Sequence, residues 1–200
     1  MNEDYEAWLV DLDGTLYRPL GVKLAMGAEL LTGPGVIPLL RAFRHEHERL
    51  REEGFTSDSR TPFEEQLGRA AKVTGADEQD VRRAVTRWMV EKPCKWIRLF
   101  RRKALLDEIR AFRANGGKTA LVSDYPARSK LRALRAEALF DTVVANGEPD
   151  GPSALKPSPE GYLTAARRLG VDASRCLVFG DRDDADGEAA RRAGMGFRLV

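Results

Sequence analysis

The stretch Asp11-Leu12-Asp13-Gly14-Thr15 follows directly on the short apolar run Ala7-Trp8-Leu9-Val10. The apolar run predicts a buried strand that ends in two carboxylates and a turn. Side chains alternate along a strand, so carboxylates at positions i and i+2 point to the same side. Gly14 allows the chain to leave the strand sharply. Two acids aimed at one point at the carboxyl end of a strand suit a metal ion and a phosphate better than a packed core.

Other apolar runs resemble the first and occur at residues 119–122, 142–145, 176–179 and 196–200. The internal runs are unbroken, which is typical of strands that are covered on both faces. Helical periodicity separates the runs. Leu105, Ile109 and Phe112 recur at i, i+4 and i+7, and a similar pattern spans residues 162–169. Strands that alternate with helices predict an α/β fold in which helices flank a parallel sheet.

Residues 18–103 interrupt this alternation, because they carry helix signals and no convincing strand. Thr61-Pro62-Phe63-Glu64 combines an N-cap, a proline at the first helical position and a capping-box acid. Two apolar stripes at helical spacing are Val36, Leu40, Phe43 and Leu50, and Val81, Ala84, Val85, Trp88 and Met89. We therefore expect an inserted all-helical cap domain over residues 18–103 and a core domain formed by residues 1–17 and 104–200. The hinges between the cap and the core are expected at residues 17–21 and 94–103.

The composition limits the class of protein. The chain has 200 residues with a formal net charge of +2, which gives no electrostatic reason to expect nucleic acid as a partner. Cys94 and Cys176 lack the spacing of metal ligands or of a disulfide framework. The acidic residues 1–4 do not resemble a signal peptide, and no apolar stretch is long enough to cross a membrane. We expect a cytoplasmic protein, a monomer or a homodimer, with no membrane or nucleic-acid partner.

Ligands of open α/β sheets bind beyond the carboxyl ends of the strands, so the residues that follow each apolar run are the candidates for chemistry. Ser123 and Asp124 follow the second run. Lys156 precedes Pro157-Ser158-Pro159 at the start of a predicted helix. The fourth run continues into Gly180-Asp181-Arg182-Asp183-Asp184-Ala185-Asp186.

These segments resemble, in order, the motifs of the haloacid dehalogenase-like hydrolase superfamily. They are an aspartate-x-aspartate-glycine-threonine turn, a serine at a strand end, a lysine before a helix, and a glycine-aspartate segment with a further acid. The resemblance implies a Rossmann-like parallel sheet of strand order 5-4-1-2-3, with a helical cap of the family's first type inserted after the first motif. The family's dehalogenases and phosphonatases lack an aspartate at the position of Asp13. Capped members that resemble phosphoglycolate phosphatases are therefore the expected type.

The resemblance also implies a role for each residue. Asp11 is the expected nucleophile, which forms an aspartyl-phosphate, and Asp13 is the expected acid and base. Mg²⁺ is the expected cofactor, held by Asp11, the backbone carbonyl of Asp13, Asp181 and Asp186; Asp186 could instead orient Lys156. The residues expected to contact a small phosphorylated metabolite are Leu12, Asp13, Ser123, Asp124 and Lys156.

Several alternatives remain open at this level. Ser123 could cap the following helix, and Asp184 replaces Asp186 if the last motif is shifted in register. His45 and His47 do not share a helix face, and His47 lies on an apolar stripe, which favours a packed histidine over a metal ligand. The basic and aromatic residues 95–98 favour a hinge that packs on the core. Alternative functions are a sugar-phosphate mutase of the same family and a non-catalytic binding protein.

Overall fold

The computed structural model describes residues 5–31, 33–57 and 59–200, so the acidic residues 1–4 lie outside it. Five parallel strands form one sheet in the order β3-β2-β1-β4-β5. The strands are β1 (Ala7–Val10), β2 (Lys118–Ser123), β3 (Thr142–Ala145), β4 (Cys176–Gly180) and β5 (Gly196–Leu199). Read from the opposite edge, this is the expected order 5-4-1-2-3. The predicted fold class is therefore confirmed.

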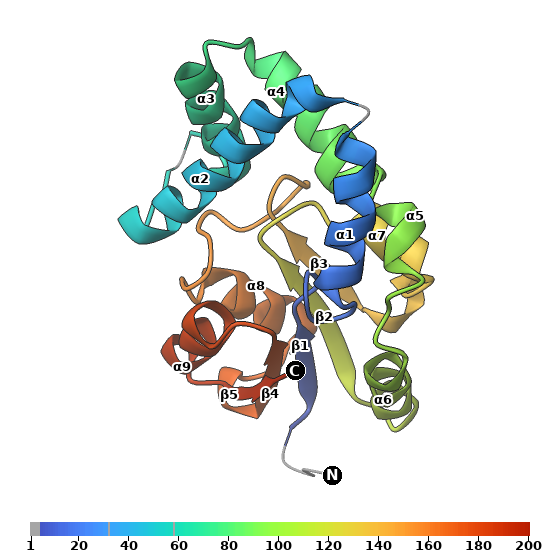
Figure 1. Ribbon diagram of the computed structural model, residues 1–200. Coiled ribbons are helices and arrows are strands. Elements are labelled where there is room, and N and C mark those ends of the chain that lie inside the picture. The colour runs from blue at the N-terminus through green and yellow to red at the C-terminus, as the bar shows by residue number, and fades with distance from the viewer. Residues whose placement is uncertain (1–4, 32, 58) are drawn as a thin grey trace.

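The helices of the sheet layer follow the predicted alternation. They are α6 (Lys103–Ala114), α7 (Arg128–Leu134), α8 (Glu160–Leu169) and α9 (Glu188–Ala193). Figure 1 shows α8 and α9 on one side of the sheet and α6 and α7 on the other. Gly170 ends α8 in the left-handed conformation, which a glycine adopts without strain.

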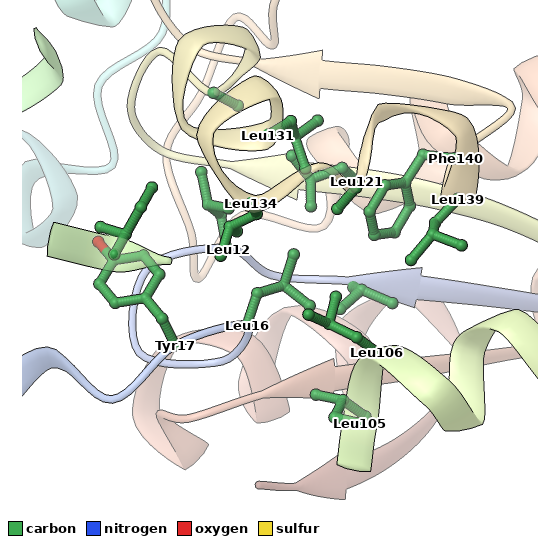
Figure 2. Packing of buried hydrophobic residues seen from close by; sticks show 14 of the residues in the cluster. Leu12, Leu16, Tyr17, Leu105, Leu106, Leu121, Leu131, Leu134, Leu139 and Phe140 are labelled. Atoms are coloured by element: carbon green, nitrogen blue, oxygen red, sulfur yellow. The ribbon is translucent and has the colours of Figure 1, made fainter. Parts of the chain in front are cut away.

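Successive side chains of the strands enter two different hydrophobic clusters, one on each face of the sheet. Leu9 and Val178 pack with α8 and α9, whereas Val10 and Phe179 pack with α6 and α7. Figure 2 shows the second cluster, in which Leu12 lies near residues of α7. Both faces of β1 and β4 are therefore covered, which explains why their apolar runs are unbroken.

Between β1 and β2, the described residues form helices and turns. The helices are α1 (Pro19–Leu30), α2 (Ile37–Glu53), α3 (Pro62–Thr74), α4 (Glu78–Val85) and α5 (Cys94–Ile97), and a wider helical segment, Thr86–Glu91, follows α4. The capping box at Thr61 and Glu64 is present. None of the helices in the described ranges is long and apolar enough to cross a membrane.

Helices α2, α3 and α4 share a third hydrophobic cluster and lie beyond the carboxyl ends of the strands (Figure 1). Residues of this cluster include Phe43, Leu67 and Val81. The two segments that connect the sheet to these helices lie side by side, because Tyr17 and Arg101 form an antiparallel bridge.

Trp88 and Met89 belong to different clusters. Trp88 lies in the cluster that contains Val22 and Met26 of α1 together with residues of α6 and α7, whereas Met89 packs against the cluster of α2, α3 and α4. The segment Thr86–Glu91 has the wider turn of a π-helix, which rotates later side chains relative to the 3.6-residue stripe. The stripe therefore divides between two clusters.

Candidate active site

Asp11 lies buried at the carboxyl end of β1. Its Oδ1 accepts a hydrogen bond from Lys156 Nζ at 2.6 Å, and its Oδ2 accepts one from Thr15 Oγ1 at 2.9 Å. The turn that follows needs a glycine, because Gly14 has a φ of +101° and a Cβ there would lie 1.9 Å from Asp181 Oδ2. The first motif thus packs directly against the fourth.

Lys156 connects two carboxylates from distant parts of the chain. It is buried, and its Nζ lies 2.6 Å from Asp11 Oδ1 and 2.8 Å from Asp186 Oδ1. The same ammonium donates to the carbonyl of Val122 at 3.2 Å. Burial opposes the charged form of Lys156, but Asp11 and the other nearby groups outweigh it and hold its pKa well above its ordinary value. Lys156 is therefore a cation at neutral pH.

Asp186, rather than Asp184, is the acid of the last motif that reaches this cluster. Asp186 is buried, and its Oδ1 accepts a hydrogen bond from the Tyr162 hydroxyl at 2.8 Å. The side chain of Asp184 is 67% exposed and pairs with Arg182. Gly180 makes room for Asp186, because a Cβ at Gly180 would lie 2.3 Å from the Cβ of Asp186.

Asp11, Asp181 and Asp186 form an acidic cluster in which one carboxylate oxygen of each lies within 4.8 Å of the others. No second group of this kind, including His45 or His47, occurs among the described residues. Burial raises the pKa of Asp11 to about 8 against the opposing charge of Lys156, and burial followed by Asp186 raises the pKa of Asp181. Converging oxygen ligands with an excess of negative charge fit a hard divalent cation such as Mg²⁺.

The side chain of Asp13 has partners that the sequence did not predict. Lys130 Nζ lies 2.7 Å from both Asp13 Oδ1 and Asp13 Oδ2, and the Tyr17 hydroxyl donates to Oδ1. Burial, followed by the charge of Asp13, raises the pKa of Tyr17 well above its ordinary value, so the hydroxyl keeps its proton. The only signal for Lys130 in the sequence is a charged residue near the apolar positions Leu131 and Leu134 of α7 and Ala127 before it.

Ser123 is the last residue of β2 and Asp124 follows it, as the sequence predicts. Ser123 is buried, and its Oγ accepts a hydrogen bond from the backbone N–H of Tyr125 at 3.2 Å. The alternative that Ser123 caps the next helix is wrong, because Glu148 Oε1 accepts the N–H groups of Ala127 and Arg128 at 2.7 Å each. Asp124 Oδ1 accepts the backbone N–H of Lys156 at 3.2 Å, which ties the loop after β2 to the lysine.

Leu12, between the two aspartates, is fully buried in the hydrophobic cluster with Leu131 and Leu134 of α7 (Figure 2). Its side chain faces away from any substrate that contacts Asp11. Only the backbone of Leu12 is available for the predicted contact. Its apolar side chain instead fixes the motif on the sheet layer.

Helix α2 contacts the loops that carry these residues. Arg51 Nε donates to the backbone carbonyl of Lys156 at 2.7 Å, and Glu48 Oε1 lies 3.4 Å from Arg182 Nη1. His47 is buried and stacks on Tyr125, with ring centroids 4.6 Å apart. Burial lowers the pKa of His47 against the opposing charge of Asp124. His47 is thus a packed histidine, as its place on the apolar stripe predicts.

Comparison with known proteins identifies similar sequences. Residues 5–194 match the family model described as haloacid dehalogenase-like hydrolase. A stretch of 63 residues is 43% identical to "Putative phosphatase YhcW" of Bacillus subtilis (strain 168) and covers 31% of this chain and 28% of that protein. A stretch of 69 residues is 41% identical to "Fructose-1-phosphate phosphatase YqaB" of Escherichia coli (strain K12) and covers 34% of this chain and 35% of that protein. The chain thus matches only about a third of the length of these relatives.

Solved structures share the fold over almost the whole chain. The "putative HAD-hydrolase YfnB" from Bacillus subtilis, solved with bound magnesium, has a TM-score of 0.66 at 15% identity, covering 99% of this chain and 89% of that chain. L-2-haloacid dehalogenase from Xanthobacter autotrophicus, with chloropropionic acid covalently bound, has a TM-score of 0.67 at 17% identity, covering 98% and 77%. At these identities the similarity establishes the fold alone.

Proposed function

The chain belongs to the haloacid dehalogenase-like hydrolase family, and on this premise we propose that it is a magnesium-dependent phosphatase of small phosphorylated metabolites. One observation carries the proposal: buried Lys156 joins Asp11 to Asp186 beside Asp181, at the carboxyl edge of the sheet. A phosphate monoester carries negative charge, and its attack by a carboxylate requires nearby cations. This cluster offers a carboxylate, an ammonium and acids suited to a divalent cation in one place.

In the proposed reaction, an oxygen of Asp11 forms a bond to phosphorus, and the bond from phosphorus to the ester oxygen breaks. Water then attacks the phosphorus, the bond to Asp11 breaks, and inorganic phosphate leaves. Lys156 stabilises the negative charge of the phosphoryl group during both steps, and Ser123 donates a hydrogen bond to one of its oxygens. These roles use the groups that lie around Asp11.

Asp13 provides the proton in the first step and takes one in the second. The leaving ester oxygen accepts a proton from the Asp13 carboxyl, and the attacking water later gives a proton back to it. Release of a halide requires no protonated oxygen. A carboxyl group two residues after the nucleophile therefore favours phosphate esters over haloacids, although dehalogenases share the fold.

Magnesium fits the acidic cluster, and we propose that Asp11, Asp181, Asp186 and the backbone carbonyl of Asp13 hold it. When bound, the ion supplies positive charge that screens the phosphoryl oxygens. Burial is the main cause of the raised pKa of Asp11 and of Asp181, and the charge of Asp186 adds to it in both. A divalent cation held there would favour the ionised form of Asp11. Asp11 then remains ionised and able to attack.

We propose further that residues 18–103 act as a cap on a core formed by residues 1–17 and 104–200. Support comes from the separate hydrophobic cluster of α2, α3 and α4 and from the contacts of α2 with Lys156 and Arg182. A cap in this position encloses a small substrate and excludes water from it. Nucleic acids and proteins are too large to be enclosed in this way.

Release of inorganic phosphate from a panel of phosphorylated metabolites, with and without Mg²⁺, tests this function. We expect hydrolysis that depends on magnesium. The Asp11→Asn variant should lose about 1,000-fold or more of the activity, because an amide cannot form the acyl phosphate. Asp183→Asn, an exposed acid, is the matched control and should keep the activity.

Other outcomes of the same assay would overturn the proposal. Isomerisation of a sugar 1-phosphate with little free phosphate would indicate a mutase. Halide release from a 2-haloacid would indicate a dehalogenase. Activity of Asp11→Asn near that of the wild type would exclude Asp11 as the nucleophile.

A further inference from the structure

Lys130 is a buried cation whose partner lies in the catalytic turn. It belongs to α7 and is 4% exposed, and its ammonium lies 2.7 Å from each oxygen of Asp13, 117 residues away in the sequence. The Tyr17 hydroxyl, also buried, donates to Oδ1 of the same carboxylate. A cation centred on both oxygens fixes the direction in which the carboxylate points, and a second donor on one oxygen fixes its rotation about that direction.

Lys130 lies on a helix whose neighbouring buried residues, Ala127, Leu131 and Leu134, are apolar. The side chain of Asp13 is 28% exposed, so the buried charge of the pair is that of Lys130. Burial of this ammonium costs solvation energy, and a well-packed apolar residue in its place is often neutral or stabilising. The ion pair instead connects α7 to a single side chain of the turn after β1.

We infer that Lys130 and Tyr17 are positioning residues, which hold the Asp13 carboxyl in the orientation that transfers a proton to the leaving oxygen. The inference rests on the proposed function and adds residues that act through Asp13. Oδ1 accepts from both Lys130 and Tyr17, whereas Oδ2 accepts from Lys130 alone. The geometry therefore assigns proton transfer to Oδ2, which gives its proton to the ester oxygen as the bond to phosphorus breaks.

Orientation matters most when the leaving group needs the proton. Nitrophenolate is a weak base that leaves without much help, whereas phenolate is a stronger base that gains more from protonation. A misplaced carboxyl should therefore slow transfer from phenyl phosphate more than transfer from p-nitrophenyl phosphate. A variant that is merely loosened or less abundant would lose activity equally on both substrates.

The test measures kcat/KM with Mg²⁺ for both aryl phosphates, because this constant reports the steps up to phosphoryl transfer to Asp11. Lys130→Met keeps a long side chain without charge and should lose about 10- to 100-fold with phenyl phosphate and about 3-fold or less with p-nitrophenyl phosphate. Lys130→Arg should recover part of the loss, because a guanidinium can also contact both oxygens. Arg132→Met, which removes an exposed cation of the same helix, is the matched control and should match the wild type.

Tyr17→Phe keeps the ring in the hydrophobic cluster and removes only the hydroxyl, so it decides the matter if Lys130→Met does not fold. It should reduce activity with phenyl phosphate more than with p-nitrophenyl phosphate. Equal losses on both substrates, or none, in the folded variants would overturn the inference while the proposed function stands. A wild type that releases no phosphate from any substrate would overturn the proposed function, and this inference with it.

Discussion

Asp184 and Asp186 lie two residues apart, yet their side chains occupy opposite environments. Asp186 is buried between Lys156 and Tyr162, whereas Asp184 is exposed and pairs with Arg182. Only Asp186 shares the acidic cluster with Asp11 and Asp181. The two residues therefore form a matched pair for testing the proposed metal site.

Asp186→Asn should weaken magnesium binding, and Asp184→Asn should leave it unchanged. Magnesium at 100 times its dissociation constant should stabilise the wild type by about 2.7 kcal/mol, because it binds only the folded state. Thermal or urea unfolding with and without Mg²⁺ measures this difference for each variant. If Mg²⁺ no longer stabilised Asp184→Asn but still stabilised Asp186→Asn, the ligand would be Asp184 and not Asp186.

His47 should make the protein less stable in mild acid. Burial lowers its pKa in the folded state below the ordinary value of 6.5, so the unfolded chain binds the proton more tightly. The stability that neutral His47 contributes is fully present above the pKa of this histidine in the unfolded chain. It is lost as the pH falls through that value of 6.5. The slope contributed by one such group is at most about 1.4 kcal/mol per pH unit.

Urea unfolding between pH 7.5 and 5.5, a range of about one pH unit on each side of 6.5, measures this effect. His47→Gln should have a flatter dependence than the wild type. His45→Gln is the control, because the side chain of His45 is 73% exposed and should leave the slope unchanged. A wild type and His47→Gln with parallel curves would show that His47 does not titrate differently on folding.

At the residue scale, the sequence predicts those parts of the site that lie at strand ends. Asp11, Ser123 and Asp181 stand at the ends of recognisable apolar runs, so their place at one edge of the sheet follows from the topology. Lys156 is marked instead by the prolines of the helix start that follows it. Lys130 is different, because its contact with Asp13 depends on how α7 packs against Leu12. No local pattern encodes such a contact between distant segments.

At the scale of elements, burial decides what the sequence reveals. The strands β1 and β4 are covered on both faces, so unbroken apolar runs mark them clearly. The start of α3 is equally clear from the sequence, because the side chains of Thr61 and Glu64 each accept the backbone N–H of the other residue. Trp88 and Met89 enter different clusters because the segment after α4 has a wider turn, and periodicity alone does not reveal such a turn.

At the scale of the molecule, α2 connects the helices beyond the sheet to the loops that carry Lys156 and Arg182. Arg51 contacts the carbonyl of Lys156, and Glu48 lies near Arg182. Helices α2, α3 and α4 share a hydrophobic cluster of their own, against which Tyr125 of the loop after β2 also packs.

The division of the buried residues into separate hydrophobic clusters predicts that a cavity made in one cluster loosens that cluster alone. Leu67→Ala removes a fully buried side chain from the cluster of α2, α3 and α4, at an expected cost of about 2–5 kcal/mol. Hydrogen exchange should then accelerate in α2, α3 and α4 and change little in β1, β2 and β4, because local opening exposes only the weakened unit. Leu9→Ala is the matched control in the sheet layer, where the same deletion should accelerate exchange in the strands. Equal acceleration throughout the chain in Leu67→Ala would mean that the helices and the sheet unfold as one unit, and that residues 18–103 are not a separate cap.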